Sequence, residues 1–210
     1  MGAQGYNKNA NATYIEETVF VIDAGHGGED PGADANGLIE KDLNLEISKL
    51  LNPYLNFSGY DTVMTREEDV LLYDPNISGS RKKQDLKNRI KIANERTNSV
   101  LISIHMNKFP LEYCAGLQTF YSKNEESFNL AQAIQTGIKS IQPENDRRVK
   151  DGSRDIYILQ NSSVPAVLIE CGFLSNNRES ALLKTDDYKN ALAFSIYYAI
   201  AEHKEIKNEI

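Results

Sequence analysis

Short apolar runs recur along the chain at the spacing expected of strands separated by helices. Residues 19–22 (VFVI) are four consecutive β-branched or aromatic residues, which is typical of a strand covered on both faces, as in a parallel sheet. The pattern predicts six strands, at residues 18–23, 60–65, 99–104, 116–122, 155–160 and 165–170.

Between most of these runs, apolar residues recur every three or four positions, which is the spacing of amphipathic helices. Residues 40–56 carry such a stripe, and we expect this helix to be kinked or split at Pro53. Thr185, followed by two aspartates, is an acceptable N-cap for the last helix. The pattern predicts further helices at residues 84–97, 125–141, 176–184 and 186–205.

Strands that alternate with helices predict the α/β class. We expect a single three-layer domain, with a mostly parallel, twisted, six-stranded sheet flanked by helices. Residues 1–16 are polar and are predicted to form a mobile leader, whereas residues 17–207 are predicted to form the folded domain. We see no linker or internal repeat that would divide it.

Composition narrows the classes of partner. The chain has 210 residues, of which 40% are hydrophobic and 25% are charged, an ordinary globular composition. Its net charge of −7 argues against binding nucleic acid or anionic membranes through a basic surface. No apolar run approaches the roughly 18 residues needed to cross a bilayer, and the first residues lack the pattern of a secretion signal. We therefore predict no nucleic-acid partner and no membrane insertion by this chain.

The chain has two cysteines, Cys114 and Cys171. They are too few for a disulfide framework and lack the spacing of a structural zinc site, so we expect two buried thiols. A Cys171 nucleophile beside Glu170 is the sharper alternative, but no histidine lies close to it in the sequence.

Histidines and carboxylates stand where the predicted strands end or helices begin. His26 follows the first apolar run, His105 closes the third predicted strand, Glu40 opens the first helix, and Glu170 ends the last strand. In open α/β sheets such groups gather at the carboxyl edge of the strands. A hydrolytic zinc site needs three ligands, an open position for water and a further carboxylate that carries protons. These four residues fit that inventory.

Each of these residues also has a structural interpretation. The glycines of the DAGHGGEDPG stretch can form tight turns or a nest of amides for an anion. His105 alone is more often a hydrogen-bonded structural histidine, and Glu40 alone suits a first helical turn through the macrodipole. Glu170 resists this interpretation, because nearly continuous apolar residues lead into it and burying an unpaired carboxylate costs several kcal/mol.

Four segments, DAGHGGEDPGA, GLIEKDLNL, ISIHMN and PAVLIECGFLSNNRE, occur in this order within residues 18–200. Together they resemble the zinc-dependent N-acetylmuramoyl-L-alanine amidases of the amidase-3 type. The resemblance implies hydrolysis of the amide between N-acetylmuramic acid and the L-alanine of the peptidoglycan stem peptide. The brevity of the chain and its ECGFLSN ending look most like the sporulation members, which act in spore cortex maturation and germination.

The resemblance also implies roles for the four residues. His26, Glu40 and His105 would bind one Zn²⁺ ion. Glu170 would be the catalytic glutamate, which takes a proton from water and passes it to the departing amine.

Other polar residues are candidates for supporting roles. Asp23 is a candidate for orienting a ligand imidazole, with a turn cap as the alternative. Asn107 is a candidate substrate contact. Arg66 and Arg154 are candidate clamps for stem-peptide carboxylates, with surface ion pairing as the alternative.

The resemblance further implies an extracytoplasmic location, in the cell wall or the forespore envelope, with peptidoglycan glycan and stem peptide as partners. Some amidases of the type that this chain resembles carry an extra helix that plugs the zinc groove. Residues 106–115 and 123–154 of this chain offer no spare helix for that role. We therefore predict that restraint and activation come from outside the chain, and that an activating or site-ordering protein partner is one such source. A zinc peptidase or deacetylase that acts on another bond of peptidoglycan is the alternative function.

Overall fold

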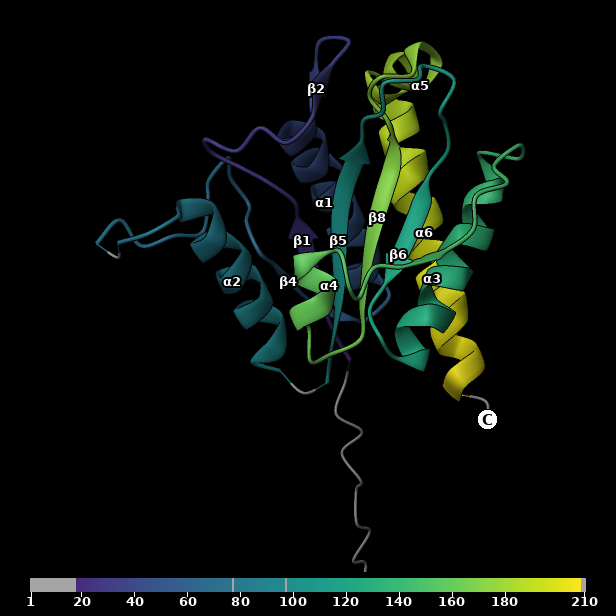
Figure 1. Cartoon of the computed structure of the whole chain (residues 1–210). Coiled ribbons are helices and arrows are strands. Elements are labelled where there is room, and N and C mark those ends of the chain that lie inside the picture. The colour runs from purple at the N-terminus through teal and green to yellow at the C-terminus, as the bar shows by residue number, and fades with distance from the viewer. Residues whose placement is uncertain (1–17, 77, 97, 209–210) are drawn as a thin grey trace, which may run out of the picture.

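The computed structural model describes residues 18–76, 78–96 and 98–208, and the predicted leader at residues 1–16 lies outside them. The described residues form a six-stranded sheet in the order β4-β1-β5-β8-β6-β7 (Figure 1). All neighbours in this sheet are parallel except β6 and β8. The strands are β1 (Val19–Ala24), β4 (Asp61–Met64), β5 (Ser99–Asn107), β6 (Gln118–Tyr121), β7 (Lys150–Asp151) and β8 (Ala166–Phe173).

Helices cover both faces of this sheet, as Figure 1 shows. One face carries α1 (Glu40–Phe57), α3 (Glu125–Gly137) and α6 (Asp186–Asn208), whose apolar side chains form the larger core cluster with those of the strands. The other face carries α2 (Arg81–Asn94) and α4 (Tyr157–Asn161), over a smaller cluster. The predicted three-layer α/β class is therefore confirmed. The remaining elements are the hairpin strands β2 (Asp34–Ala35) and β3 (Leu38–Ile39), the 3₁₀ turn η1 (Ile138–Ser140) and helix α5 (Asn177–Leu183).

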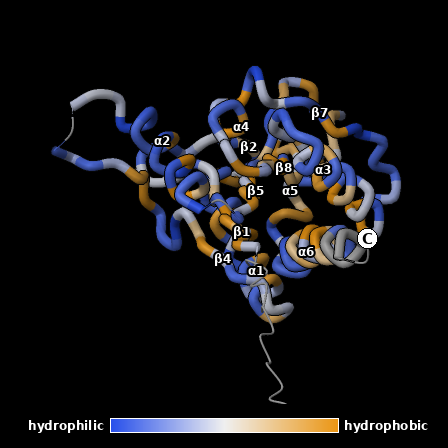
Figure 2. Tube along the Cα trace, turned by 90° about the horizontal axis from the view of Figure 1, so that it is seen from below, coloured by the Kyte–Doolittle hydropathy of each residue, from blue (hydrophilic) through white to orange (hydrophobic). Residues whose placement is uncertain are grey.

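The hydrophobic residues concentrate in the strands at the centre of the molecule, whereas α2 and the outer loops are largely hydrophilic (Figure 2). Phe20 and Ile22 on β1 and Ile102 on β5 have no exposed surface. At roughly 25 cal/mol for each Å² of apolar surface removed from water, such side chains are the main stabilising element of the sheet. Within the described residues, no helix combines the length and the apolar character needed to cross a bilayer.

The prediction of a strand at residues 155–160 is wrong. These residues enter the short helix α4, which buries Ile158 and Leu159 against the smaller core cluster. A short apolar run cannot be assigned to strand or helix by periodicity alone. The sixth strand is instead β7, a two-residue edge strand that pairs with Phe120 and Tyr121 of β6.

Two smaller expectations also change. Helix α1 runs without interruption through Pro53, whose side chain is exposed, so the helix is not split there. Cys171 is fully buried as expected, and burial raises the pKa of its thiol, which makes it a poor nucleophile. Cys114, in contrast, is only partly buried.

The extra length of two strands matters for the site. β5 continues to Asn107 and β8 to Phe173, beyond their predicted ends at residues 104 and 170. His105 and Glu170 therefore lie within the ladder, where they are directly paired. Their relative position is set by strand pairing and does not depend on a loop.

Candidate active site

Three predicted ligands converge at the carboxyl edge of the sheet. His26 follows β1, Glu40 opens α1, and His105 lies on β5. Each offers one ligand atom, and these atoms all lie within 4.8 Å of one another. Oε1 of Glu40 is 3.2 Å from Nε2 of His26 and 2.9 Å from Nδ1 of His105. The three side chains thus form a cluster with the donor set of a metal site.

The side chains of this cluster strongly influence one another's pKa values. Burial acts to raise the pKa of Glu40, but hydrogen bonds from His105 and His26 outweigh it and hold the pKa well below its usual range. Burial acts to lower the pKa of His26, but Glu40 and Asp30 outweigh it and raise the pKa. Glu40 is therefore an anion at neutral pH, which is the form that binds a cation.

Two glycines leave room for the ligands. A Cβ atom on Gly25 would lie 2.2 Å from Nε2 of His105, and one on Gly32 would lie 2.5 Å from Oε2 of Glu40. Gly32 also has a φ of +67°, a conformation that L side chains rarely adopt. At these two positions the glycines provide close approach to the ligands, in addition to forming turns.

Asp30 orients the imidazole of His26, and sequence reasoning missed it. Its Oδ2 atom is 2.9 Å from Nδ1 of His26, which leaves Nε2 facing Glu40. The carboxylate is also paired with Lys82, at 3.0 Å. Carboxylates commonly fix the orientation and tautomer of a ligand imidazole in this way. Asp30 stands four residues after His26, but nothing in the sequence distinguished it from Glu29 beside it.

Two buried arginines hold the backbone that carries His26. Arg89 donates to the carbonyl oxygens of Ala24 and His26, each at 2.6 Å. Arg66 donates to the carbonyl oxygens of Ala24 at 2.8 Å and Gly25 at 3.1 Å. His26 itself has a φ of +60°, unusual for a residue with a side chain. The hydrogen bonds from the two arginines hold this strained turn in place, so the position of His26 does not depend on the loop alone.

The predictions for Arg66 and Asp23 are therefore wrong. Arg66 is 3% exposed and its donors are taken by carbonyl groups, so it does not clamp a substrate carboxylate. Asp23 is fully buried and accepts from Ser103, Thr65 and Arg89, in place of an imidazole. The free energy of a buried charge explains both results, because each is costly unless it is paired or hydrogen-bonded.

The pKa values of this buried network follow from the same pairing. Burial acts to raise the pKa of Asp23, but Arg89 and the Ser103 hydroxyl outweigh it and lower the pKa. Arg89 is also 2.8 Å from Asp85, and the two aspartates raise its pKa despite burial. Asp23 and Arg89 are therefore charged at neutral pH, and together with Asp85 they form an ion network beneath the His26 loop.

Glu170 lies on β8 beside His105 of β5. Burial raises the pKa of Glu170 to about 7; the nearby charge of Glu40 acts in the same direction, whereas His105 and His26 act to lower it. Its Oε2 atom is buried and lacks a hydrogen-bond partner among the described residues. Such an atom is costly to keep, and a buried carboxyl group with a raised pKa beside a cluster of metal-ligand side chains is typical of a catalytic site.

A cleft of about 190 Å³ opens beside the cluster, on the face covered by α2 and α4. Asn107 ends β5, partly exposed, and Arg154 is exposed in the turn that precedes α4. Their roles as substrate contacts stay predictions. The cleft is lined by Asp23, Gly25, His26, Asp30, Lys82, Asp85, Leu86, Arg89, His105, Ile156, Tyr157, Ile158 and Leu168.

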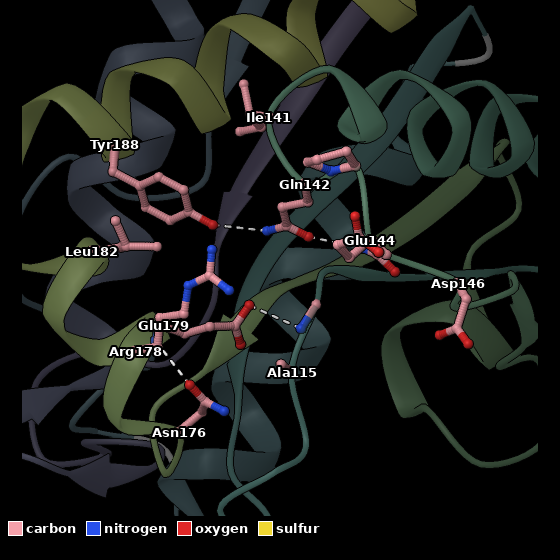
Figure 3. Close-up of a pocket in the computed structure, with 13 residues that line it drawn as sticks. Ala115, Ile141, Gln142, Glu144, Asp146, Asn176, Arg178, Glu179, Leu182 and Tyr188 are labelled. Carbon is pink, nitrogen blue, oxygen red and sulfur yellow. Dashed lines mark hydrogen bonds between the residues drawn. The ribbon is translucent and has the colours of Figure 1, made fainter.

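A second hollow, of about 270 Å³, lies beside α5 (Figure 3). It is not lined by His26, Glu40, His105 or Glu170. Glu179, one of the residues that line it, accepts hydrogen bonds from the amides of Gly116 at 2.8 Å and Phe173 at 2.7 Å. Burial raises the pKa of Glu179, partly offset by these amides. Glu179 thus fixes the residues that precede β6 and end β8.

Comparisons with known proteins agree with this geometry. Residues 20–202 match the Amidase_3 family, described as N-acetylmuramoyl-L-alanine amidase. The germination-specific N-acetylmuramoyl-L-alanine amidase of Bacillus subtilis (strain 168) is 38% identical over 188 residues, 88% of this chain and 79% of that protein.

Solved structures give the same result. The CwlD amidase from Clostridioides difficile, in complex with the GerS lipoprotein, superposes with a TM-score of 0.85 and 37% identity, covering 90% of this chain and 98% of that one. AmiC2 of Nostoc punctiforme gives a TM-score of 0.78 and 28% identity, covering 90% and 97%. The chain therefore belongs to the Amidase_3 family and is an N-acetylmuramoyl-L-alanine amidase, which hydrolyses the amide between N-acetylmuramic acid and the stem peptide.

Proposed function

We propose that His26, Glu40 and His105 bind one Zn²⁺ ion and that Glu170 is the proton carrier of the amidase reaction. The observation that supports this proposal is the convergence of three ligand atoms within 4.8 Å beside a buried, unpartnered carboxylate oxygen of Glu170. Two imidazoles and one carboxylate, with a position left for water, are a donor set of catalytic zinc sites. The residues present therefore fit the metal.

The chemistry divides between the metal and the chain. When bound, zinc lowers the pKa of water towards about 7 and polarises a carbonyl group. Glu170 accepts the proton of the attacking water and gives it to the departing nitrogen, because an amine leaves poorly as an anion. Its place on β8, paired with His105, holds the carboxyl group in a fixed position relative to the ligands.

Two variants separate these roles. His26→Ala should lose zinc at micromolar free metal, whereas Glu170→Gln should keep zinc and lose roughly 10²–10⁴ of the hydrolysis rate. Zinc is measured by elemental analysis, and activity by release of stem peptides with a new L-alanine N-terminus. Glu125→Gln, at an exposed position on α3, is the control. A Glu170→Gln protein with near-normal turnover would exclude Glu170 as the proton carrier.

We further propose that the substrate is spore-cortex peptidoglycan and that the enzyme acts outside the cytoplasm. This proposal is supported by the 38% identity to a relative named as a germination-specific amidase. The test compares product release from purified cortex and vegetative peptidoglycan. Equal rates on the two polymers would argue against a cortex role.

A protein partner is the third part of the proposal. The CwlD structure is described in complex with a lipoprotein. In this chain, α3 buries Leu130, Ala131 and Ile134 in the core, so it is not a removable plug. Zinc affinity and activity are to be measured with and without co-expressed envelope proteins. Full zinc loading and activity of the chain alone would exclude an obligatory partner.

A further inference from the structure

A row of polar residues continues across the sheet from the metal cluster. His105 is paired with Glu170, and Glu170 is paired in turn with Gln118 of β6. Two positions along their strands, Leu168 and Phe120 pack in or against the core cluster of α2 and α4. Because side chains two residues apart share a face, Glu170 and Gln118 face the same side of the sheet as that cluster.

The side chain of Gln118 is hydrogen-bonded to Arg147, an arginine that sequence reasoning did not single out. Nη1 of Arg147 donates to Oε1 of Gln118 at 3.1 Å, and its Nε donates to the carbonyl oxygen of Ala115 at 2.5 Å. Its guanidinium also lies over the ring of Phe173, 4.5 Å from the centroid. Gln118 is 4% exposed, and its amide donates to the carbonyl oxygen of Arg148 at 2.8 Å. The guanidinium is therefore held from three sides.

The elements that hold Arg147 are themselves fixed. Glu179 accepts hydrogen bonds from the amide of Phe173, the residue whose ring stacks against the guanidinium, and from the amide of Gly116, which follows Ala115. Ala115, Gly116 and Glu179 are among the residues that line the hollow of Figure 3. A guanidinium with so little freedom loses little entropy when it binds an anion.

The local charge favours an anionic ligand. Residues 147–154 (RRVKDGSR) carry four cations and one acid in a chain whose net charge is −7. Arg147 is half-buried and forms no ion pair with a carboxylate in the described part of the chain. Its nearest polar partners are neutral oxygens of an amide side chain and a carbonyl group. Its charge is thus available to a ligand.

We propose that Arg147 binds the free carboxylate of the second stem-peptide residue while Glu170 acts at the scissile amide, an inference that rests on the proposed function of Glu170. Neighbouring strands lie ~4.8 Å apart, so the side chain of Gln118 brings the guanidinium to ~10 Å from Glu170. An extended peptide advances ~3.5 Å per residue, so two residues place the second carboxylate roughly 7 Å from the scissile amide at which Glu170 acts, on the scale of that separation. Guanidinium groups bind carboxylates with paired, charge-assisted hydrogen bonds.

The substrate itself provides the first test, which requires no mutation. Soluble glycan-peptide fragments are prepared in two forms, in which the second stem residue carries either a carboxylate or a carboxamide. The zinc-loaded enzyme should cleave the carboxylate form with a kcat/KM about 10- to 100-fold higher. Equal cleavage of both forms would overturn the role of Arg147, and no cleavage of either would count against the proposed function instead.

Variants then assign the preference to Arg147. Arg147→Gln should lose about 10- to 100-fold in kcat/KM on the carboxylate form, mainly through KM, and little on the carboxamide form. Arg148→Gln removes the same charge from an exposed neighbour and should keep the wild-type preference. Arg147→Lys should recover part of the preference, because it keeps the charge without the paired geometry.

A binding measurement completes the test. The zinc-loaded Glu170→Gln protein is titrated with the uncleaved carboxylate fragment, with and without Arg147→Gln. We expect the added change to weaken binding about tenfold or more at unchanged zinc content. An equal preference in Arg147→Gln and the wild type, or an equal loss in Arg148→Gln, would overturn the proposal.

Discussion

The two sides of the active site differ in how their polar groups are satisfied. On the β1 side, Arg89 and Arg66 donate to carbonyl oxygens of the turn that carries His26, and Asp30 is hydrogen-bonded to the imidazole of His26. On the β8 side, Glu170 keeps a buried oxygen that has no partner within the described residues. One side is internally complete, and the other leaves its hydrogen-bonding capacity open.

This difference reflects two requirements of the reaction. Ligands must stay in place before substrate or metal arrives, so their supporting charges are paired within the protein. A group that transfers protons must change its partner during the reaction, so a permanent hydrogen bond to the protein would compete with it. The β1 side therefore contributes to stability, whereas the β8 side gives up stability for function.

The largest expected effect comes from breaking the β1 side. Arg89→Met leaves Asp23 and Asp85 charged and unpaired in the core, and should lower the free energy of unfolding by about 3–5 kcal/mol at pH 7. Urea unfolding measures this change in the free energy of unfolding. Lys91→Met on the same helix removes an exposed pair at 3.6 Å and should cost less than about 1 kcal/mol.

The same experiment has a pH signature. The folded-state pKa of Asp23 is lowered, so its contribution to stability is present above its unfolded pKa and is lost as pH falls through the folded pKa. The difference between wild type and Arg89→Met should therefore narrow in acid, because protonation removes the charge that Arg89 compensates. A difference that stays constant down to pH 3 would contradict the ion network as its cause.

A smaller effect of opposite sign is expected on the β8 side. The pKa of Glu170 is raised to about 7 in the folded protein, so ionisation destabilises the fold progressively as pH rises from the unfolded pKa to the folded one. Glu170→Gln in the presence of a chelator should raise the unfolding free energy at pH 8, on the order of 3 kcal/mol at most. The gain should vanish near pH 4. Loss of stability at pH 8 would show that the carboxylate is paired after all.

The smallest effect concerns the orientation of one ligand. Asp30→Asn keeps the size of the side chain but removes the charge that faces Nδ1 of His26. Zinc affinity should fall roughly 10- to 100-fold, as is typical when the partner of a ligand imidazole is changed. Competition with a fluorescent chelator measures it. Glu29→Gln, its exposed neighbour paired with Arg81, should bind zinc as the wild type does.

The sequence by itself determined the fold class, most strands and the four central residues. Apolar runs of strand length and helical stripes are local patterns, and they predicted the layers of the sheet. His26, Glu40, His105 and Glu170 were identifiable because each polar side chain stands at the end of an apolar run or the start of a helix. The structure brings the first three together and sets Glu170 beside His105.

Only the tertiary structure decided which polar and charged side chains are partners. Asp23 meets Arg89 across 66 positions of sequence, and Gln118 meets Arg147 across 29. It also decided that residues 157–161 form a helix, because Ile158 and Leu159 bury their side chains in a core built by distant segments. The sequence specifies that a charge or an apolar run must be buried somewhere, but packing alone sets its partner, since the cost of burial depends on every group that surrounds it.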